Sequence, residues 1–427
     1  MDIKIIHNCF LKCKSISIDT RKIEAGSFFV AIKGDNYDAN TFAKEALEKG
    51  ASFVIIDNPD YFVDERTIVV KDSLKALQEL ARFHRNYLNI TIIALTGSNG
   101  KTTTKELIQV VLSKKFKTKA TFGNLNNHIG VPLTLLSFDK ETEIGIVEMG
   151  ANHQKEIEFL CEIVQPDFGY ITNFGKAHLE GFGGVEGVIK GKCELYNYLS
   201  KHNKTVFINL NDSIQVDKSV GIKPYTFGVN QLNSDVILTD VTANPFVEVT
   251  FSNCKIKSHL IGLYNSNNIN AAIAIGSFFE VPILDIKAAI EGFVPENNRS
   301  QLLNINSNEI ILDAYNANPS SMAVAIENFI QLKKPNKIAI LGDMFELGDE
   351  SLEEHKSIVN LLLNKNSITT YFIGKDFYSN KTEQINCNFY KTFEAFSEAF
   401  KTKKNENSLI LIKGSRGMAL ERTLGLL

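Results

Sequence analysis

The stretch from Ile90 to Leu107, ITIIALTGSNGKTTTKEL, holds the residues of this chain whose types and spacing best fit a phosphate-binding loop. Its apolar run predicts a buried strand, and the small-residue loop that follows leads into a segment of helix-forming residues. Gly97 and Gly100 allow a tight turn that points backbone N–H groups inward, and a helix N-terminus adds partial positive charge. Lys101 can neutralise phosphate oxygens, and the Thr102 hydroxyl is the usual Mg²⁺ ligand at this position.

The loop reads G-x-x-G-K-T and is shorter than the common P-loop, which would need a glycine where this chain has Leu95. An accidental glycine turn is the alternative interpretation. The position of the motif between a buried strand and a helix favours binding of the phosphates of ATP. The residues expected to bind ATP here are Gly97, Ser98, Asn99, Gly100, Lys101, Thr102 and Thr103.

Polar residues also follow two other strands of the same region. Glu148 closes the strand in EIGIVEM, where its carboxylate could hold Mg²⁺ beside Thr102; a solvated carboxylate at a strand end is the alternative. His178 lies in the Gly-rich loop TNFGKAHLEGFGG after the next strand. A lone histidine is more often structural than a ligand, but a strand-end loop facing a phosphate site favours a functional role.

Three further positions leave two interpretations open. Lys192 lies in VEGVIKGKCELYNYL, which predicts a single helix, and periodicity alone favours a surface lysine there, as it does for Lys190. Asn126 and Asn127 precede the turn HIGVP, where their amides can hydrogen-bond a substrate or cap the turn.

The last third of the chain offers charged residues at a junction and at strand ends. Arg299 falls where a domain junction is expected, so its guanidinium could reach a γ-phosphate on domain closure or remain on the surface. Asp313 ends a strand before YNANP, where a carboxylate can accept hydrogen bonds from ribose hydroxyls. Other polar residues at such strand ends are Asp343, Lys413, Ser415 and Arg416.

The elements that must position these side chains form three α/β units. Residues 1–84 predict a small N-terminal α/β domain, with strands in ISIDTRKI, SFFVAIKG, ASFVIID and TIVV, one clear helix in TFAKEALEKG, and an amphipathic helix from Ser73 to Tyr87 leading onward. Residues 85–297 predict a central P-loop ATPase-like domain with a mostly parallel sheet and an antiparallel edge between Pro224 and Leu263. Residues 298–427 predict a smaller Rossmann-like domain.

The composition agrees with a division into three domains and argues against several classes of protein. At 427 residues the chain is too long for one ordinary core, so two or three domains are expected. Its 44% hydrophobic and 22% charged residues are typical of a globular protein in water, and a net charge of −3 argues against nucleic-acid binding through a basic surface. The six scattered cysteines favour free thiols in a reducing compartment. Without an apolar run of membrane-spanning length or a signal-peptide core near the start, a cytoplasmic protein is expected.

Taken together, these strings resemble the Mur ligases, the ATP-dependent amide-bond-forming enzymes of peptidoglycan precursor synthesis. The resemblance covers nearly the whole chain and rests, in order, on IDTRKIEAGSFFVAIKG, TGSNGKTTTKEL, NNHIGVPLTLL, VEMGANHQKEI, ITNFGKAHLEGFG, DAYNANPSSM, LGDMFELG and LIKGSRGM. Within the family, NNHIGVPLTLL, EMGANH and YNANPSSM are similar to the member that adds D-alanyl-D-alanine to a UDP-linked muramoyl tripeptide.

The resemblance implies roles that spacing alone does not give. Lys192 matches the lysine that the family carries as a CO₂-derived carbamate, and Thr102, Glu148 and His178 match its other metal ligands, for two Mg²⁺ ions. Catalytic roles are implied for Lys101, Lys192, His178 and Arg299. Asn268 matches the residue that reads adenine, Arg299 the one on the γ-phosphate and Asp313 the ribose-binding acid.

The implied substrate-binding residues fall into two groups. Thr20, Arg21 and Gly34 match the region that holds the UDP-sugar end. The others, nearer the reacting groups, are Asn126, Asn127, Asn316, Lys413, Ser415 and Arg416. The chain departs from the family pattern at Asp38–Ala39–Asn40, at Tyr264 and at Leu312, where the family usually shows Asp-Gly-His, histidine and aspartate.

The implied reaction passes through an acyl phosphate, with small-molecule partners only: ATP, UDP-muramoyl-tripeptide and D-alanyl-D-alanine. We expect a monomer with no nucleic-acid partner. A sister Mur ligase or a folylpolyglutamate-type ligase with another amino substrate remains the alternative enzyme. A nucleotide-dependent switch protein is the alternative from another class, since it needs a phosphate loop but no second metal ligand.

Overall fold

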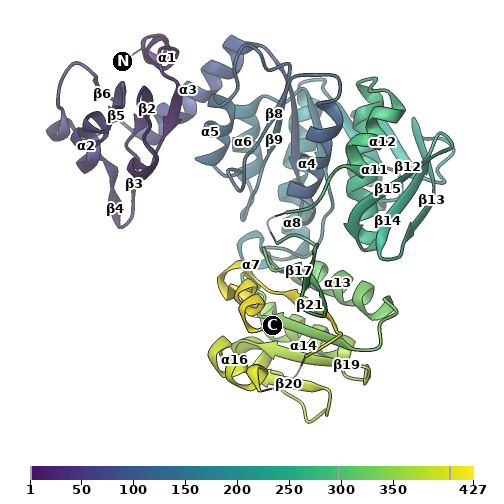
Figure 1. Cartoon of the computed structure of the whole chain (residues 1–427). Helices are drawn as coiled ribbons and strands as arrows, with labels where there is room; N and C mark the ends of the chain where they lie inside the picture. The colour runs from purple at the N-terminus through teal and green to yellow at the C-terminus, as the bar shows by residue number, and fades with distance from the viewer. Residues whose placement is uncertain (1, 297, 403–404) are drawn as a thin grey trace.

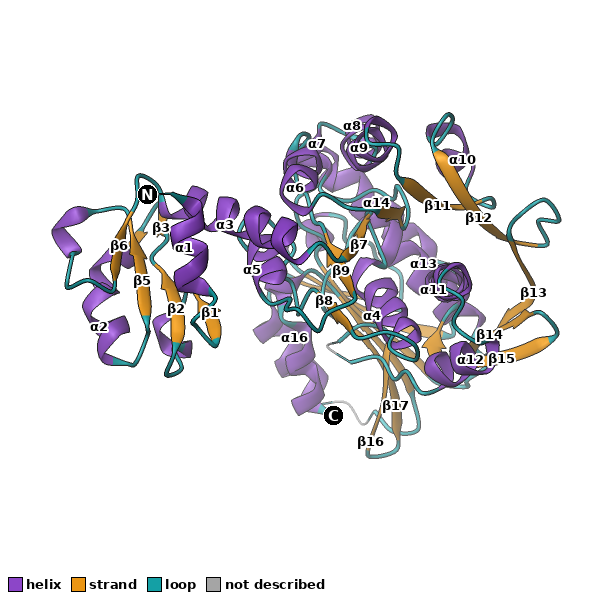
Figure 2. Cartoon of the chain, turned by 90° about the horizontal axis from the view of Figure 1, so that it is seen from above, coloured by secondary structure: helices purple, strands orange, loops and turns teal. Residues whose placement is uncertain are grey.

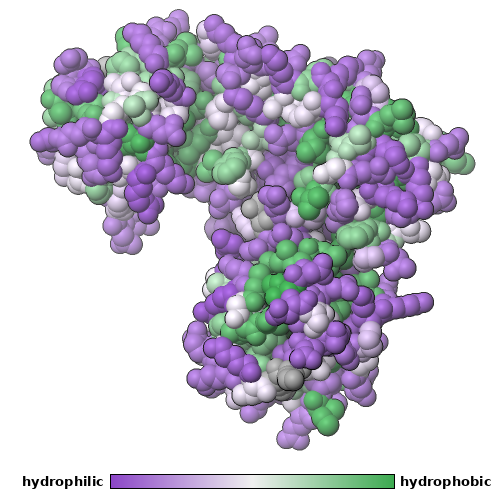
Figure 3. All heavy atoms as spheres, viewed as in Figure 1, coloured by the Kyte–Doolittle hydropathy of each residue, from purple (hydrophilic) through white to green (hydrophobic). Residues whose placement is uncertain are grey.

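The computed structural model describes residues 2–402 and 405–427 except residue 297, and it has three lobes, each built on its own sheet (Figure 1). The predicted boundary at residue 297 lies outside the described residues, and the other predicted domain limits stay predictions. In the space-filling view of Figure 3, open space separates the N-terminal lobe from the C-terminal lobe, and both adjoin the central one.

The N-terminal lobe has a parallel sheet in the order β1-β2-β5-β6 and a small hairpin of β3 and β4. Helix α3 (Ser73–Leu88) runs from this lobe to the central one (Figures 1 and 2). The other elements are α1 (Ile3–Phe10), β1 (Ser15–Ser17), β2 (Ser27–Val30), β3 (Lys33–Gly34), β4 (Tyr37–Asp38), α2 (Ala43–Glu48), β5 (Phe53–Ile56) and β6 (Thr67–Val69).

This lobe differs from the sequence-based prediction in one helix that was not predicted and in one strand that is shorter than predicted. Helix α1 was not expected, yet its start is capped by Asp2, whose side chain accepts a hydrogen bond from the backbone N–H of Lys4. The strand expected in ISIDTRKI ends after β1 because Asp19 accepts a hydrogen bond from the backbone N–H of Arg21 and caps a 3₁₀ turn over Thr20–Lys22.

The central sheet has the order β15-β14-β13-β12-β11-β10-β7-β9-β8. Its strands pair in parallel except at the antiparallel edge of β13, β14 and β15, which the sequence predicted. The strands are β7 (Thr91–Thr96), β8 (Thr118–Ala120), β9 (Ile144–Glu148), β10 (Phe168–Ile171), β11 (Thr205–Asn209), β12 (Lys223–Val229), β13 (Val236–Ala243), β14 (Phe246–Phe251) and β15 (Cys254–Ile261).

Helices cover both faces of this sheet. The single helix expected in VEGVIKGKCELYNYL is two, α8 and α9, which meet at Cys193. Glu194 opens α9 and accepts hydrogen bonds from the backbone N–H groups of Lys155 and Glu158, which fixes this end against α6. The helices are α4 (Lys101–Leu112), α5 (Gly130–Leu136), α6 (Glu156–Val164), α7 (Leu179–Phe182), α8 (Val185–Lys192), α9 (Glu194–Lys201), α10 (Ser213–Lys218), α11 (Ser266–Phe278) and α12 (Ile283–Glu291).

The C-terminal sheet has the order β16-β17-β21-β18-β19-β20 and is parallel except for the edge strand β16. The sequence predicted neither β16 nor the other edge strand, β20. Its strands are β16 (Gln301–Ile305), β17 (Asn308–Asp313), β18 (Lys337–Gly342), β19 (Ile368–Ile373), β20 (Cys387–Tyr390) and β21 (Leu409–Lys413). The helices are α13 (Pro319–Gln331), α14 (Ser351–Leu362), α15 (Lys375–Ser379) and α16 (Phe393–Lys401). Within the described residues, no helix combines the length and apolar character needed to cross a membrane.

Candidate active site

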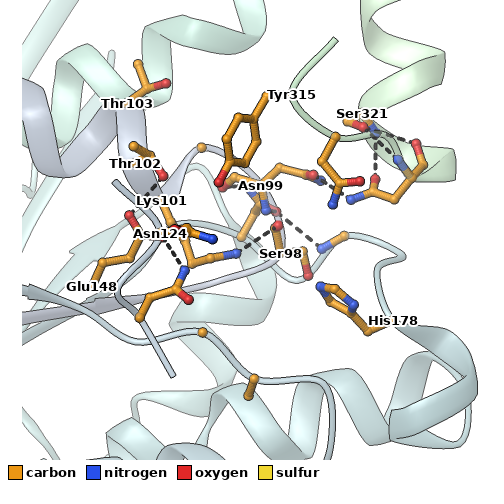
Figure 4. Close-up of a pocket in the computed structure, with 18 of the residues that line it drawn as sticks. Ser98, Asn99, Lys101, Thr102, Thr103, Asn124, Glu148, His178, Tyr315 and Ser321 are labelled. Carbon is orange, nitrogen blue, oxygen red and sulfur yellow. Dashed lines mark hydrogen bonds between the residues drawn. The ribbon is translucent and has the colours of Figure 1, made fainter. Parts of the chain in front are cut away.

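A cavity of about 1060 Å³ lies between the central and C-terminal lobes. It is bounded by the loops that follow β7 and β9 on one side and β17 on the other, so the carboxyl ends of strands from two sheets face one space. Figure 4 shows Glu148 and His178 on opposite sides of this space. The cavity brings together the following predicted residues: Ser98, Asn99, Gly100, Lys101, Thr102, Thr103, Asn126, Asn127, Glu148, His178, Asn268, Arg299, Asp313, Asn316 and Lys413.

The phosphate loop has the local geometry that its glycines predict. Gly97 has a φ of +138°, and a Cβ there would lie 2.1 Å from the Oγ1 of Thr172. Gly100 precedes α4 with a φ of +77°, and a Cβ there would lie 2.5 Å from the Oδ1 of Asn268. Any side chain at either position would collide with its neighbour, so the close approach of the loop to β10 and α11 requires glycine.

Lys101 begins α4 and folds back over the loop. Its Nζ donates hydrogen bonds to the carbonyl oxygens of Gly97, at 2.6 Å, and Ser98, at 3.2 Å. Burial lowers the pKa of Lys101, the carboxylate of Glu148 opposes this shift, and the guanidinium of Arg299 reinforces it. The ammonium group therefore lies within the loop, where an incoming phosphate can replace carbonyl oxygens as its partner.

Glu148 is held by hydrogen bonds on both carboxylate oxygens. The parallel register pairs it with Leu95 at the end of β7, which places it beside the phosphate loop. Thr102 donates from Oγ1 to Oε2 at 2.9 Å, and Asn126 donates from Nδ2 to Oε1 at 2.8 Å. Asn127 instead caps a turn, since its Oδ1 accepts from the backbone N–H groups of Ile129 and Gly130.

The oxygen donors of Thr102 and Glu148 fit a hard cation such as Mg²⁺, which prefers one or two protein oxygens together with phosphate oxygens and water. No group of three or more His, Cys, Asp or Glu residues poised for a metal occurs among the described residues. Two protein oxygens, from Thr102 and Glu148, suit a metal that arrives with a nucleotide and takes its remaining ligands from phosphate and water.

His178 sits at the start of α7 with a φ of +53°. Its Nδ1 pairs with the Oε2 of Glu346, a residue of the C-terminal lobe. The backbone joins the same contact, because the N–H of Glu180 donates to the carbonyl oxygen of Glu346 at 3.3 Å. The sequence-predicted histidine therefore lies at the wall of the cavity, where it is hydrogen-bonded to a carboxylate of the C-terminal lobe.

Lys192 is not a surface residue: only 1% of it is exposed. Its Nζ donates one hydrogen bond, of 3.3 Å, to the carbonyl oxygen of Ala151, and it lies 4.9 Å from the centre of the Phe182 ring. No carboxylate of the described residues forms an ion pair with it. Burial and the nearby Lys101 hold the pKa of Lys192 well below its ordinary value. Lys192 lies behind the cavity wall, which Ala151 itself lines.

At the C-terminal side of the cavity, Arg299 packs on an aromatic ring and Asp313 forms an ion pair. The guanidinium of Arg299 stacks 3.6 Å from the centre of the Tyr315 ring, and that of Arg416 lies 5.3 Å from the same centre. Asp313 accepts from the Nζ of Lys413 at 2.6 Å and from the backbone N–H of Ser300 at 3.1 Å. Asp313 is thus ion-paired before any ribose arrives.

Asn268 is also engaged within the protein. Its Oδ1 accepts from the Oγ1 of Thr104 at 3.0 Å, and its Nδ2 donates to the Oδ1 of Asn265 at 2.8 Å. These bonds tie α11 to α4 beside the phosphate loop.

A second cavity of about 280 Å³ adjoins the first and shares His178, Asn316 and Asn318 with it. Ser415 and Arg416 line it, and the Ser415 hydroxyl accepts from the backbone N–H of Phe345 at 2.9 Å.

The predicted UDP-end residues lie elsewhere. Thr20, Arg21 and Gly34 belong to the N-terminal lobe and are not part of either cavity wall. The Arg21 side chain is paired with Asp19 and exposed. The structure therefore does not bring this group together with the phosphate loop.

Sequence reasoning missed three residues of the site: Tyr315, Asn318 and Glu346. Asn318 donates from Nδ2 to the Oδ1 of Asn99 at 2.7 Å, so the C-terminal lobe contacts the phosphate loop itself. The string Asn-Pro-Ser-Ser was a usable signal, because Asn318 caps α13 and forms a capping box with Ser321.

Comparisons with known proteins match this architecture. Family models for the Mur ligase catalytic domain, the Mur ligase middle domain and the Mur ligase glutamate ligase domain match residues 12–85, 95–276 and 298–416. The chain is 34% identical over 421 residues to the UDP-N-acetylmuramoyl-tripeptide–D-alanyl-D-alanine ligase of Bacillus subtilis, covering 95% of this chain and 91% of that one. This chain belongs to the Mur ligase family.

Other Mur ligases agree with the match in sequence and structure. The Escherichia coli ligase of the same name is 31% identical, with 96% of this chain and 92% of that one covered. The MurF crystal structure from Acinetobacter baumannii has a TM-score of 0.86 at 29% identity, covering 99% of this chain and 97% of that one. MurF from Thermotoga maritima, solved in complex with ADP, has a TM-score of 0.83 at 27% identity, covering 98% and 97%. The predicted family and the three-domain α/β fold are confirmed.

Proposed function

We propose that this Mur ligase uses ATP to join D-alanyl-D-alanine to UDP-N-acetylmuramoyl-tripeptide, giving the pentapeptide precursor of peptidoglycan. The observation that carries the proposal is the near-full-length match to ligases of that name in B. subtilis and E. coli. It is supported by a site in which the phosphate loop, an ordered carboxylate and an arginine face one cavity.

The chemistry follows from the substrates. A free carboxylate is a poor electrophile, so ATP transfers its γ-phosphoryl group to the terminal carboxylate of the tripeptide and an acyl phosphate forms. The amine of D-alanyl-D-alanine attacks the acyl carbon, and the phosphate leaves from the tetrahedral intermediate with the carboxylate oxygen it was bound to. Lys101 and Arg299 stabilise the negative charge on the transferred group.

Two Mg²⁺ ions would neutralise the triphosphate and orient the attacking carboxylate. Thr102 and Glu148 would hold one ion, since their oxygens are already 2.9 Å apart. His178 and a carbamate on Lys192 would hold the other. Carbamate formation needs a neutral amine, and the direction of the Lys192 pKa shift favours that form. In this structure the buried Nζ has one hydrogen bond, to the carbonyl oxygen of Ala151, and a metal ion bound to the carbamate would give the buried group a further polar partner.

The remaining residues bind the substrates. Asp313 would give up its ion pair with Lys413 and accept hydrogen bonds from the ribose hydroxyls. The side-chain amide of Asn268 would form hydrogen bonds with adenine in place of its bond to Asn265. The second cavity, with Arg416 and Ser415 at its wall, would take the dipeptide, whose carboxylate pairs with the guanidinium. Thr20, Arg21 and Gly34 would bind the UDP end when the N-terminal lobe closes. A single chain supplies all of these groups, so we propose that the enzyme acts as a monomer, in the cytoplasm where its nucleotide substrates are made.

The test measures phosphate release from ATP and Mg²⁺ with the UDP-muramoyl-tripeptide and D-alanyl-D-alanine, omitting each in turn. Release that requires both, with a pentapeptide product by mass spectrometry, is the expected result. Release with another amino acid, or with a folylglutamate acceptor, would instead assign a sister activity on the same scaffold. ATP binding without release under any combination would favour a nucleotide-dependent switch.

A further inference from the structure

Glu346 lies on the segment between β18 and α14 and reaches across the domain boundary to the start of α7. It contacts that turn twice, with its carboxylate on the Nδ1 of His178 and with its carbonyl oxygen on the N–H of Glu180. Glu346 and His178 both have positive φ angles, of 62° and 53°. Two left-handed residues meeting across an interface indicate a contact that the surrounding structure enforces.

The pairing has a consequence for the imidazole. An aspartate or glutamate on Nδ1 keeps the proton there, and the lone pair is then on Nε2. No hydrogen bond or ion pair to Nε2 of His178 occurs among the described residues, and His178 lines both cavities. Metal-binding histidines are commonly oriented in this way by a carboxylate behind them.

Resting on the proposed function, we propose that Glu346 is a positioning residue for the metal site: it fixes the tautomer and orientation of His178, so that the second metal ion binds tightly only when the C-terminal lobe is docked. Binding of the amino substrate in the adjoining cavity and completion of the metal site are thereby coupled through one carboxylate, because Glu346 also lines that cavity.

Other contacts of the same interface do not reach the imidazole and supply the control. Lys176 pairs with Glu354 at 2.5 Å, and the N–H of Lys176 donates to the Oγ of Ser320 at 2.7 Å. Glu354→Gln removes an interdomain ion pair whose lysine, Lys176, is two residues before His178 in the chain. The substitution leaves the contact between Glu346 and His178 in place.

The first measurement is ¹⁵N NMR of the full chain labelled at histidine, without nucleotide or metal, with the His178 signals assigned from the His178→Gln spectrum. Wild type and Glu354→Gln should show a protonated Nδ1 and an unprotonated Nε2 at His178. Glu346→Ala should shift the population toward the Nε2–H form. An unchanged tautomer in Glu346→Ala overturns the proposal.

The second measurement is Mn²⁺ binding by electron paramagnetic resonance, with a non-hydrolysable ATP analogue and UDP-muramoyl-tripeptide. Glu346→Ala should weaken the second Mn²⁺ about 10–100-fold. Glu346→Gln keeps an oxygen acceptor and should restore most of the affinity, and Glu354→Gln should match wild type. Unchanged Mn²⁺ affinity in Glu346→Ala, with only the KM for D-alanyl-D-alanine raised, would show that Glu346 reads the substrate amine instead.

The two proposals can fail separately. A wild-type chain that releases no phosphate with D-alanyl-D-alanine refutes the proposed function, whereas the tautomer measurement needs no substrate and still decides the role of Glu346.

Discussion

The amide of Asn318 donates a 2.7 Å hydrogen bond to the side-chain oxygen of Asn99, which joins the C-terminal lobe directly to the phosphate loop. The backbone carbonyl of Asn99 is itself held by Asn173 and Thr172, at 2.9 and 2.6 Å. A change in the position of the C-terminal lobe should therefore be transmitted to the loop that we propose binds ATP.

This relationship predicts different effects for two substitutions at Asn318. Asn318→Ser keeps an N-cap for α13 but cannot reach Asn99, so turnover should fall about 5-fold with the free energy of unfolding unchanged within about 0.5 kcal/mol. Asn318→Ala should lose the same activity and about 1 kcal/mol of stability as well. Steady-state turnover and urea unfolding measure the two effects. Equal stability of both variants would contradict the capping argument.

Lys192→Ala should abolish turnover, with a fall of about 10³-fold or more, because the proposed metal ligand is lost. Lys190→Ala is the matched control, since Lys190 is on the same helix but exposed, and its activity should stay within about 2-fold of wild type. Wild-type activity should also fall when CO₂ is removed from the buffer and return with bicarbonate. Near-normal turnover of Lys192→Ala would exclude the carbamate.

Arg299→Lys keeps the charge but loses the flat guanidinium that stacks on Tyr315. We expect kcat to fall about 10-fold in Arg299→Lys and about 10³-fold in Arg299→Ala, with the affinity for ATP changed less. Tyr315→Phe retains the ring and should stay close to wild type. Single-turnover kinetics separate the two quantities, and a lysine variant with full kcat would show that the planar group is not needed.

A buried pair far from the site predicts a pH dependence of stability. His7 on α1 lies 3.0 Å from His84 on α3, through its Nε2 and the Nδ1 of His84, and the other nitrogen of His84 lies 3.0 Å from the carbonyl oxygen of Phe138. Burial, with His84 adding to it, lowers the pKa of His7 from 6.5 to about 4.

Because the native pKa of His7 is the lower one, the unfolded chain binds a proton that the native protein does not between pH 6.5 and pH 4. The free energy of unfolding should therefore decrease as the pH falls through this window, by at most about 3 kcal/mol from this group. In His7→Phe that part of the slope should vanish, while the exposed His202→Gln should keep it. Chemical unfolding at a series of pH values checks this, and identical slopes in wild type and His7→Phe would refute it.

Sequence reasoning worked where the signal was local. The phosphate loop follows from its glycines, and Glu148 from a strand end in a parallel sheet, since both depend on neighbours along the chain or on a general rule of topology. The break between α8 and α9 was missed because it is set by Glu194 contacting α6, not by a helix-breaking residue.

The interdomain contacts could not be predicted in the same way. His178 and Glu346 are 168 positions apart, and Asn99 and Asn318 are 219 apart, so no periodicity joins them. Lys192 is buried, which is opposite to the surface position that its helical pattern indicates, and only the family resemblance singled out this lysine as functional. Tertiary packing around polar residues decides these features, and it leaves little trace in local sequence.

The most direct test of the account follows one oxygen atom. UDP-muramoyl-tripeptide labelled with ¹⁸O in its terminal carboxylate is incubated with the full chain, ATP, Mg²⁺ and D-alanyl-D-alanine, and the released phosphate is analysed by mass spectrometry. An acyl phosphate formed by γ-phosphoryl transfer predicts one ¹⁸O atom in each phosphate, together with pentapeptide product. Unlabelled phosphate would mean that water, and not the tripeptide carboxylate, attacks ATP, which would contradict the proposed ligase chemistry.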